Sequence, residues 1–195
     1  MKKALFVILL AVMHQVTLAQ DVKKVKEQLA ANNLSGAKTM IDQMLANPKN
    51  QKNAEVWYLK GKTYSAIADN PKEREAVPDA RMTGLEAFKK ALEIDKNSTT
   101  LYMTVDNYQP VFKLYTSGFE EGASHYNAEK YDDALTTFKN TGVIGDYIFA
   151  NGWGLYKLDT TLTYYCALSA MNAKKDDEAV MYFKKLADAN VGGAP

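Results

Sequence analysis

Cysteine and histidine are among the rarest residues of this chain. Among 195 residues there is one cysteine, Cys166, and there are two histidines, His14 and His125. A single cysteine excludes an intramolecular disulfide, and so few histidines exclude the histidine clusters that bind zinc. Cys166 lies in the apolar stretch 162–170, where we expect a small buried residue rather than a reactive thiol. His125 is expected to pack or to lie on the surface. The sequence therefore predicts no metal and no cofactor.

An excess of charge is also missing. The 24 basic and 23 acidic residues give a formal net charge of +1, which argues against nucleic acid as the main partner. The chain contains no P-loop, no H-E-x-x-H motif and no nucleophile elbow. The segment Gly152-Trp153-Gly154 lacks the third glycine of a dinucleotide-binding turn. We therefore expect a protein that is not an enzyme.

The first 19 residues have the three parts of a secretory signal peptide. Two lysines follow the initial methionine, an apolar run covers 4–12, and small residues lead to Ala19. The alternative, an uncleaved membrane anchor, needs about 20 apolar residues, whereas His14 and Gln15 interrupt this run. We expect cleavage after Ala19 and a mature domain over 20–195 that has no transmembrane segment.

Cleavage at this position would give an exported protein, periplasmic or associated with the bacterial envelope. The residue after the cut is Gln20 rather than cysteine, so the chain offers no site for the lipid anchor of a lipoprotein. Loss of Lys2 and Lys3 would change the formal net charge from +1 to −1.

Apolar residues recur at helical spacing along most of 20–195. The stretch 97–108 is less clear, because Leu101, Met103 and Val105 alternate as in a strand, but we favour a short helix that starts near Ser98 and Thr99. The segment 72–79 is charged, contains Pro78 and is expected to be an inserted loop. The other expected helices are 21–31, 37–46, 55–68, 80–94, 110–128, 132 to about 142, 160–172 and 176–189.

The helices carry a repeated pattern of small and aromatic residues. Trp57, Gly61 and Tyr64 lie on one helix, and Gly84, Phe88 and Ala91-Leu92 lie on the next. Gly122, Ala134 and Phe138 follow, then Ala167, Ala170, Ala179 and Phe183, and the first pair offers Ala37, Ile41, Met44 and Pro48. This pattern resembles the tetratricopeptide repeat (TPR) over about 21–190. Positions 37, 84, 134 and 179 are 47, 50 and 45 residues apart instead of 34, so each unit carries an insertion or longer helices.

The resemblance implies an all-α fold, a right-handed α-solenoid of about four degenerate helix pairs. In TPR proteins the first helix of each pair lines the inner, concave face. Carried onto this sequence, that face becomes a candidate binding groove with Tyr58, Lys62, Phe119, Tyr126, Asn127, Tyr164 and Asn172.

The resemblance also implies a binding or scaffolding protein whose partner is an envelope protein or an extended peptide. The alternative is a glycan-binding helical-repeat protein, which the aromatic segment Tyr147 to Trp153 favours and the missing lipid-anchor cysteine disfavours. A third hypothesis, the regulatory part of an enzyme, needs a catalytic domain beyond residue 195. The last expected helix runs into Val191-Gly192-Gly193 without a polar cap, so we expect either a longer array or a partner that covers this end.

Overall fold

The computed structural model describes residues 18–154 and 157–189, and every regular element within these ranges is helical. The expected all-α class is therefore confirmed. All but the last two residues of the expected signal peptide 1–19 lie outside the described residues. A first helix covers 18–30, and the others are α2 (Leu34–Ala46), η1 (Asn50–Lys52), α3 (Ala54–Asp69), α4 (Pro71–Ala76), α5 (Ala80–Ile94), α6 (Lys96–Val105), α7 (Gln109–Asn127), α8 (Tyr131–Ala150), α9 (Thr160–Asn172) and α10 (Asp176–Asp188).

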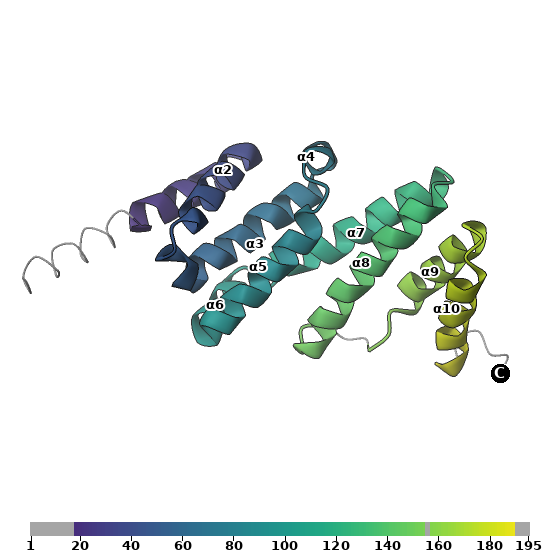
Figure 1. The fold of residues 1–195 in the computed structure, drawn as a ribbon. Coiled ribbons are helices and arrows are strands. Elements are labelled where there is room, and N and C mark those ends of the chain that lie inside the picture. Colours follow the sequence, from purple (N-terminus) through teal and green to yellow (C-terminus); the bar gives the residue numbers. More distant parts are fainter. Residues whose placement is uncertain (1–17, 155–156, 190–195) are drawn as a thin grey trace, which may run out of the picture. The chain divides into compact units, whose positions relative to one another are not determined.

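The chain forms two compact units that divide between Pro110 and Val111, at the start of α7. In unit 1, α2 and α5 both pack against α3, and α6 packs against α3 and α5. In unit 2, α9 packs against both α8 and α10, and tight turns join α7 to α8 and α9 to α10 (Figure 1). Each unit is thus built from helices that are adjacent in sequence.

Three of the turns between helices have the same geometry. Each contains a non-glycine residue with a left-handed backbone: Asn32 (φ 54°), Glu129 (φ 60°) and Lys174 (φ 58°). The N–H of the following residue donates to the carbonyl five positions earlier, at 2.9 Å in all three turns, which is the Schellman arrangement. Five residues after each left-handed position comes a buried alanine, at Ala37, Ala134 and Ala179. The repeat that the alanine positions predict in the sequence is therefore also present in the structure, as a turn of the same geometry before each of these three alanines.

A glycine in one helix lies directly against a phenylalanine ring of the next helix, once in each unit. A Cβ atom added to Gly61 of α3 would lie 2.5 Å from the ring of Phe88 of α5. A Cβ atom added to Gly122 of α7 would lie 2.5 Å from the ring of Phe138 of α8. Both rings are fully buried. Because real Cβ atoms do not approach so closely, only glycine allows these helix pairs their present separation.

Two expectations for unit 1 need correction. Residues 72–79 were expected to be a loop, but α4 occupies most of this segment, because the side chain of Asn70 accepts from two N–H groups of its first turn and Pro71 stands at its first position. The segment 97–108 contains a helix, as we expected, and not a strand. Its cap is Asp95, whose carboxylate accepts from the N–H of Ser98 at 3.0 Å, instead of Ser98 or Thr99.

The main correction for unit 2 concerns α8. We expected this helix to end near Thr141-Gly142, but it continues to Ala150. The physical reason is its buried stripe, since Ile144 and Ile148 continue the spacing of Phe138 and Thr141 and are also buried. The two internal glycines weaken the helix locally, and this burial outweighs them.

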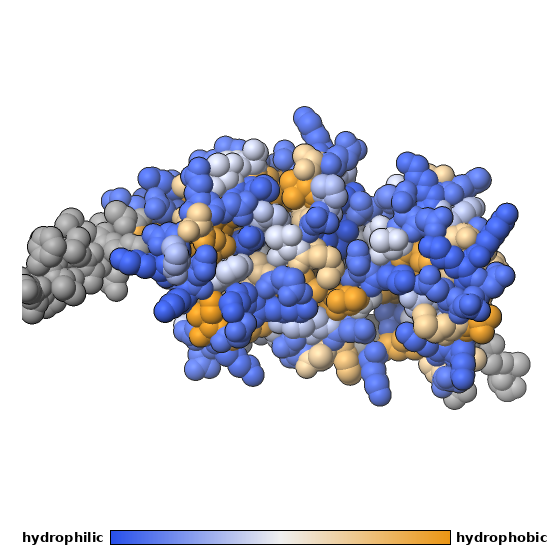
Figure 2. All heavy atoms as spheres, in the orientation of Figure 1, coloured by the Kyte–Doolittle hydropathy of each residue, from blue (hydrophilic) through white to orange (hydrophobic). Residues whose placement is uncertain are grey.

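The surface is polar with small apolar patches. Figure 2 shows hydrophilic residues over most of the described face, with apolar residues in separate groups. In unit 2 the exposed apolar side chains include Tyr164, Val180, Met181 and Phe183. The face of α10 that carries the last three is thus not covered by other described residues.

We expect Gly61→Ala and Gly122→Ala to destabilise the protein. The new methyl group would force an overpacking adjustment that costs about 1–3 kcal/mol, against a helix-propensity gain of about 0.5–1 kcal/mol. Urea unfolding followed by circular dichroism measures the net change in the free energy of unfolding.

Gly142→Ala is the matched control in α8. Its new Cβ would lie 3.7 Å from Leu162, an ordinary contact, so only the propensity gain remains and the variant should be more stable. Equal effects of all three substitutions would contradict the close approach of glycine and phenylalanine.

Candidate functional site

Of the two groove residues predicted in unit 1, Tyr58 belongs to the interior and Lys62 is partly exposed. Tyr58 is 4% exposed, and its hydroxyl donates to Asp106 Oδ2 at 2.6 Å. Lys62 pairs with the same carboxylate oxygen at 2.7 Å. Burial, then the bond to Asp106, raises the pKa of Tyr58 well above its usual range. Tyr58 therefore stabilises unit 1 and presents little surface to a partner, whereas we expected it on the groove.

In unit 2 four of the predicted groove residues come together around a tyrosine that the sequence analysis did not select. The ring centroid of Tyr165 lies 5.6 Å from that of Phe119, 5.8 Å from that of Tyr126 and 6.4 Å from that of Tyr164. Asn172 donates to the hydroxyl of Tyr126 at 3.0 Å. We call Phe119, Tyr126, Tyr164, Tyr165 and Asn172 the aromatic cluster. The cluster connects the two first helices, α7 and α9, of unit 2.

The members of the aromatic cluster differ in exposure. Tyr164 is 48% exposed, Asn172 is exposed, and Phe119, Tyr126 and Tyr165 are partly buried. Asn127, the remaining predicted residue, is exposed at the end of α7. The cluster therefore presents a tyrosine ring and amide groups to solvent above a layer of packed rings. Tyr165 could have been found from its position beside Tyr164, but the helical pattern assigns neighbouring residues to different faces.

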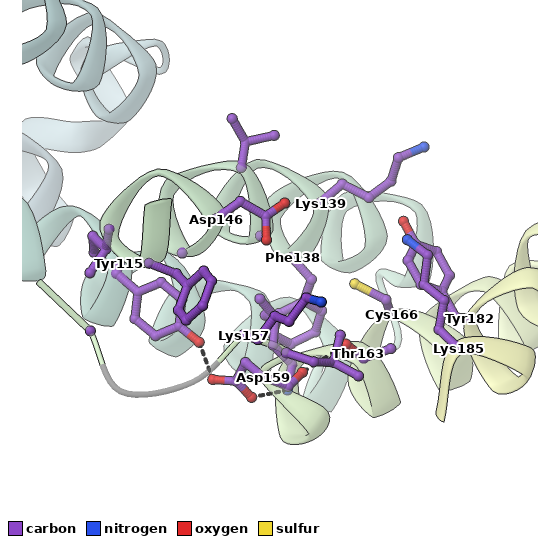
Figure 3. A pocket seen from close by; sticks show the side chains of 18 of the residues that line it. Tyr115, Phe138, Lys139, Asp146, Lys157, Asp159, Thr163, Cys166, Tyr182 and Lys185 are labelled. Atoms are coloured by element: carbon purple, nitrogen blue, oxygen red, sulfur yellow. Dashed lines mark hydrogen bonds between the residues drawn. The ribbon is translucent and has the colours of Figure 1, made fainter. Parts of the chain in front are cut away.

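Unit 2 also contains a cavity that the sequence did not predict. Its volume is about 610 Å³, and it lies among the start of α7, α8 from Phe138 onward, residues 153–154 and 157–159, α9 and α10 (Figure 3). Its wall is mostly apolar, with Phe138, Ile148, Phe149, Trp153 and Leu162 among the lining residues. This volume is in the range of small-molecule sites, about 300–1,000 Å³. Trp153 is in the aromatic segment noticed in the sequence, and its ring lies 5.7 Å from that of Tyr147.

One polar contact fixes the end of the cavity nearest α9. The hydroxyl of Tyr115 donates to Asp159, whose other carboxylate oxygen accepts from the N–H of Leu162 at 2.8 Å (Figure 3). Asp159 is the expected N-cap of α9, which begins at Thr160 as predicted. Burial, followed by the bond to Asp159, raises the pKa of Tyr115 well above its usual range. Both oxygens of the Asp159 carboxylate thus already accept hydrogen bonds from other residues of unit 2.

Cys166 is part of the cavity wall and is 3% exposed, so the expectation of a buried thiol is confirmed. Burial raises the pKa of the Cys166 thiol to about 12, although Lys185 and Lys139 oppose the shift. Burial also raises the pKa of the neighbouring Tyr182 to about 12. Both groups are therefore neutral near pH 7, and the thiol is not a nucleophile there.

We expect Tyr58→Ala to destabilise unit 1. The substitution removes ring contacts with Phe88 and Tyr102, at 5.6 and 5.5 Å between centroids, and should cost about 3–5 kcal/mol. Tyr164→Ala, at an exposed position, should change the free energy of unfolding by less than about 1 kcal/mol. Chemical denaturation of both variants measures the difference, and equal costs would refute the interior assignment of Tyr58.

We expect Cys166 to resist alkylation until the pH is far above 9. With a pKa of about 12, the thiolate fraction at pH 8 is about a thousandfold smaller than for an exposed cysteine. Iodoacetamide labelling followed by mass spectrometry should therefore be slow for the folded protein and fast in denaturant. Fast labelling of the folded protein at pH 8 would contradict the buried, neutral thiol.

Comparison with protein family models, with curated proteins and with solved structures finds no match to this chain. Across 18–154 and 157–189, no group of three or more histidine, cysteine, aspartate or glutamate side chains is arranged to hold a metal ion. Within the same ranges no helix has the length and apolar character needed to cross a membrane. The candidate sites are therefore the aromatic cluster and the cavity of unit 2.

Proposed function

We propose that the chain is a TPR-like helical-repeat protein of the cell envelope that binds an extended segment of another envelope protein and catalyses no reaction. The segment would lie over the aromatic cluster of unit 2. The observation that carries this proposal is the aromatic cluster itself: Tyr126 packs on Tyr165 and accepts from the exposed Asn172, and Tyr164, next to Tyr165, is 48% exposed.

The repeated turns and the glycine–phenylalanine contacts support the repeat assignment. In the tetratricopeptide pattern a small residue of the first helix allows the second helix to approach. Gly61 with Phe88 and Gly122 with Phe138 have this relation, and each phenylalanine is in the second helix of its pair. Helix pairs of this kind bury their apolar faces by stacking and use the remaining face for binding.

The chemistry of the aromatic cluster suits an extended peptide. Tyrosine supplies a large contact area at low entropic cost and is enriched where few residues dominate binding. The side chains of Asn127 and Asn172 are exposed and can donate to and accept from a peptide backbone. The second envelope hypothesis, glycan binding, depends instead on Trp153, which lies in the cavity wall. The two hypotheses therefore predict different contact residues.

Site-specific photocrosslinking in cells of the source organism tests the proposal. A photoreactive phenylalanine analogue at Tyr164 should capture one recurrent envelope protein, whereas the same analogue at the exposed Lys96 of unit 1 should not. In the purified complex, Tyr164→Ala should weaken binding by about 2 kcal/mol, or about thirtyfold in Kd, with little change in stability.

Two results would contradict the proposal. Equal capture at Tyr164 and Lys96 would mean that the contact is not specific to the aromatic cluster. Absence of a protein adduct, together with a change in Trp153 fluorescence on adding oligosaccharide, would favour glycan binding. Tryptophan emission can be assigned to Trp153 in a Trp57→Phe variant, because the chain has two tryptophans.

A further inference from the structure

The cavity of unit 2 plays no part in the proposed binding of a peptide, and it has the features of a ligand site. Its size is about 610 Å³, and the buried side chains of Phe138, Leu162 and Cys166 form part of its wall. The raised pKa of Cys166 has burial as its largest cause, which indicates that this part of the wall is poorly solvated. An apolar group in the cavity would restore dispersion contacts that the wall now lacks.

Three lysines and two aspartates lie around this apolar wall, and several of them are already engaged. Lys139 pairs with Glu178 at 2.7 Å, and Figure 3 shows its side chain pointing away from the cavity. Asp159 accepts from Tyr115 and caps α9. The remaining charged groups are Asp146, Lys157 and Lys185, which have no ion-pair partner among the described residues.

In formal charge Lys157 and Lys185 are balanced by Asp146 and Asp159. The two oxygens of Asp159 already accept from the hydroxyl of Tyr115 and the N–H of Leu162, so the two lysines are the groups that can still donate to a ligand at the mouth. In Figure 3 the side chain of Lys157 lies across the mouth between α8 and α9. Lys185 lies on α10, with its ammonium 5.3 Å from the ring of Tyr182. Both lysines are exposed, so their charges stay hydrated while the wall behind them is apolar. A ligand that complements this arrangement has an apolar body and a single negative head.

We propose that the cavity binds an amphiphilic carboxylate, an alkyl or aryl acid whose apolar body lies against Phe138, Ile148 and Leu162 and whose carboxylate lies at Lys157. A sugar fits less well, because few polar side chains line the interior. A cationic amphiphile would bring its head group against the two lysine ammonium groups, Lys157 and Lys185. The ligand is a free acid. A membrane lipid, whose anionic head is a phosphate ester, is a different occupant, and vesicles distinguish it from the free acid.

Fluorescence of Trp153 provides the readout. In the full chain carrying Trp57→Phe, titration with decanoate below its micelle concentration should change the Trp153 emission in a saturable way. Decyltrimethylammonium at the same concentrations is the matched cation and should bind at least tenfold more weakly. Vesicles of phosphatidylglycerol test the membrane source, and a response to vesicles without a response to decanoate would overturn the proposal.

Two independent substitutions connect the response to the cavity. Lys157→Met should weaken decanoate binding about tenfold and Lys157→Arg should preserve it, whereas Lys184→Met on the exposed side of α10 should have no effect. Gly142→Leu should fill the cavity and abolish binding, while Gly142→Ala should retain it. Circular dichroism and the urea midpoint of each variant show whether it is folded.

The proposal is overturned if decanoate and decyltrimethylammonium bind equally, or if the folded Lys157→Met and Gly142→Leu variants bind as tightly as the parent. A response to an apolar peptide without a response to decanoate would also overturn it. Photocrosslinking at Tyr164 is independent of these titrations, so failure of one proposal leaves the other standing.

Discussion

The contact on which both units depend is a phenylalanine ring placed against the backbone of a neighbouring helix at a glycine. Phe88 meets Gly61 and Phe138 meets Gly122 at a separation that no Cβ atom allows. Each ring is fully buried and fixes how far apart its two helices lie. In unit 2 the same Phe138 ring stacks on Tyr165, at 5.4 Å between centroids, and also lines the cavity. The packing of one helix pair therefore determines the positions of both candidate sites.

The turns between helices show how the chain tolerates unfavourable local geometry. Glu129 and Lys174 adopt a left-handed backbone that costs non-glycine residues about 1–2 kcal/mol each. The Schellman hydrogen bonds at these turns satisfy carbonyl groups at the helix ends, and the buried Ala134 and Ala179 follow at a fixed distance. The segment before α5 lacks this turn and contains α4 instead. This insertion accounts for the longer spacing between positions 37 and 84, whereas the interval from 84 to 134 contains α6 and the interval from 134 to 179 contains the long α8.

The sequence predicted the existence of nearly every helix, and it predicted the exact bounds of α5 and α9, where strong caps or apolar periodicity decide. It did not predict α4, because the charge of 72–79 and Pro78 suggested a loop, although Asn70 and Pro71 suit the start of a helix. It did not predict the length of α8, because Gly142 suggested an end that the burial of Ile144 and Ile148 overcame. Of the predicted groove residues, Phe119, Tyr126, Tyr164 and Asn172 do lie together. Tyr58 does not lie on such a surface, because Tyr102 of α6 packs against its ring. Helical spacing along the sequence does not show whether a later helix covers an aromatic residue.

The length of α8 connects the fold to the cavity. Had the helix ended near Gly142, the residues that form one wall, Ile148 and Phe149, would not lie opposite Leu162. Gly142 itself is different from Gly61 and Gly122, because a methyl group would fit there in ordinary contact with Leu162. A helix-interior glycine costs about 0.5–1 kcal/mol relative to alanine, and packing alone does not require it at this position. A residue such as Gly142, which disfavours its own secondary structure and is not required by packing, is more common at functional sites than elsewhere. A methyl group at position 142 would leave the cavity open, whereas a side chain as large as leucine would project into it from α8.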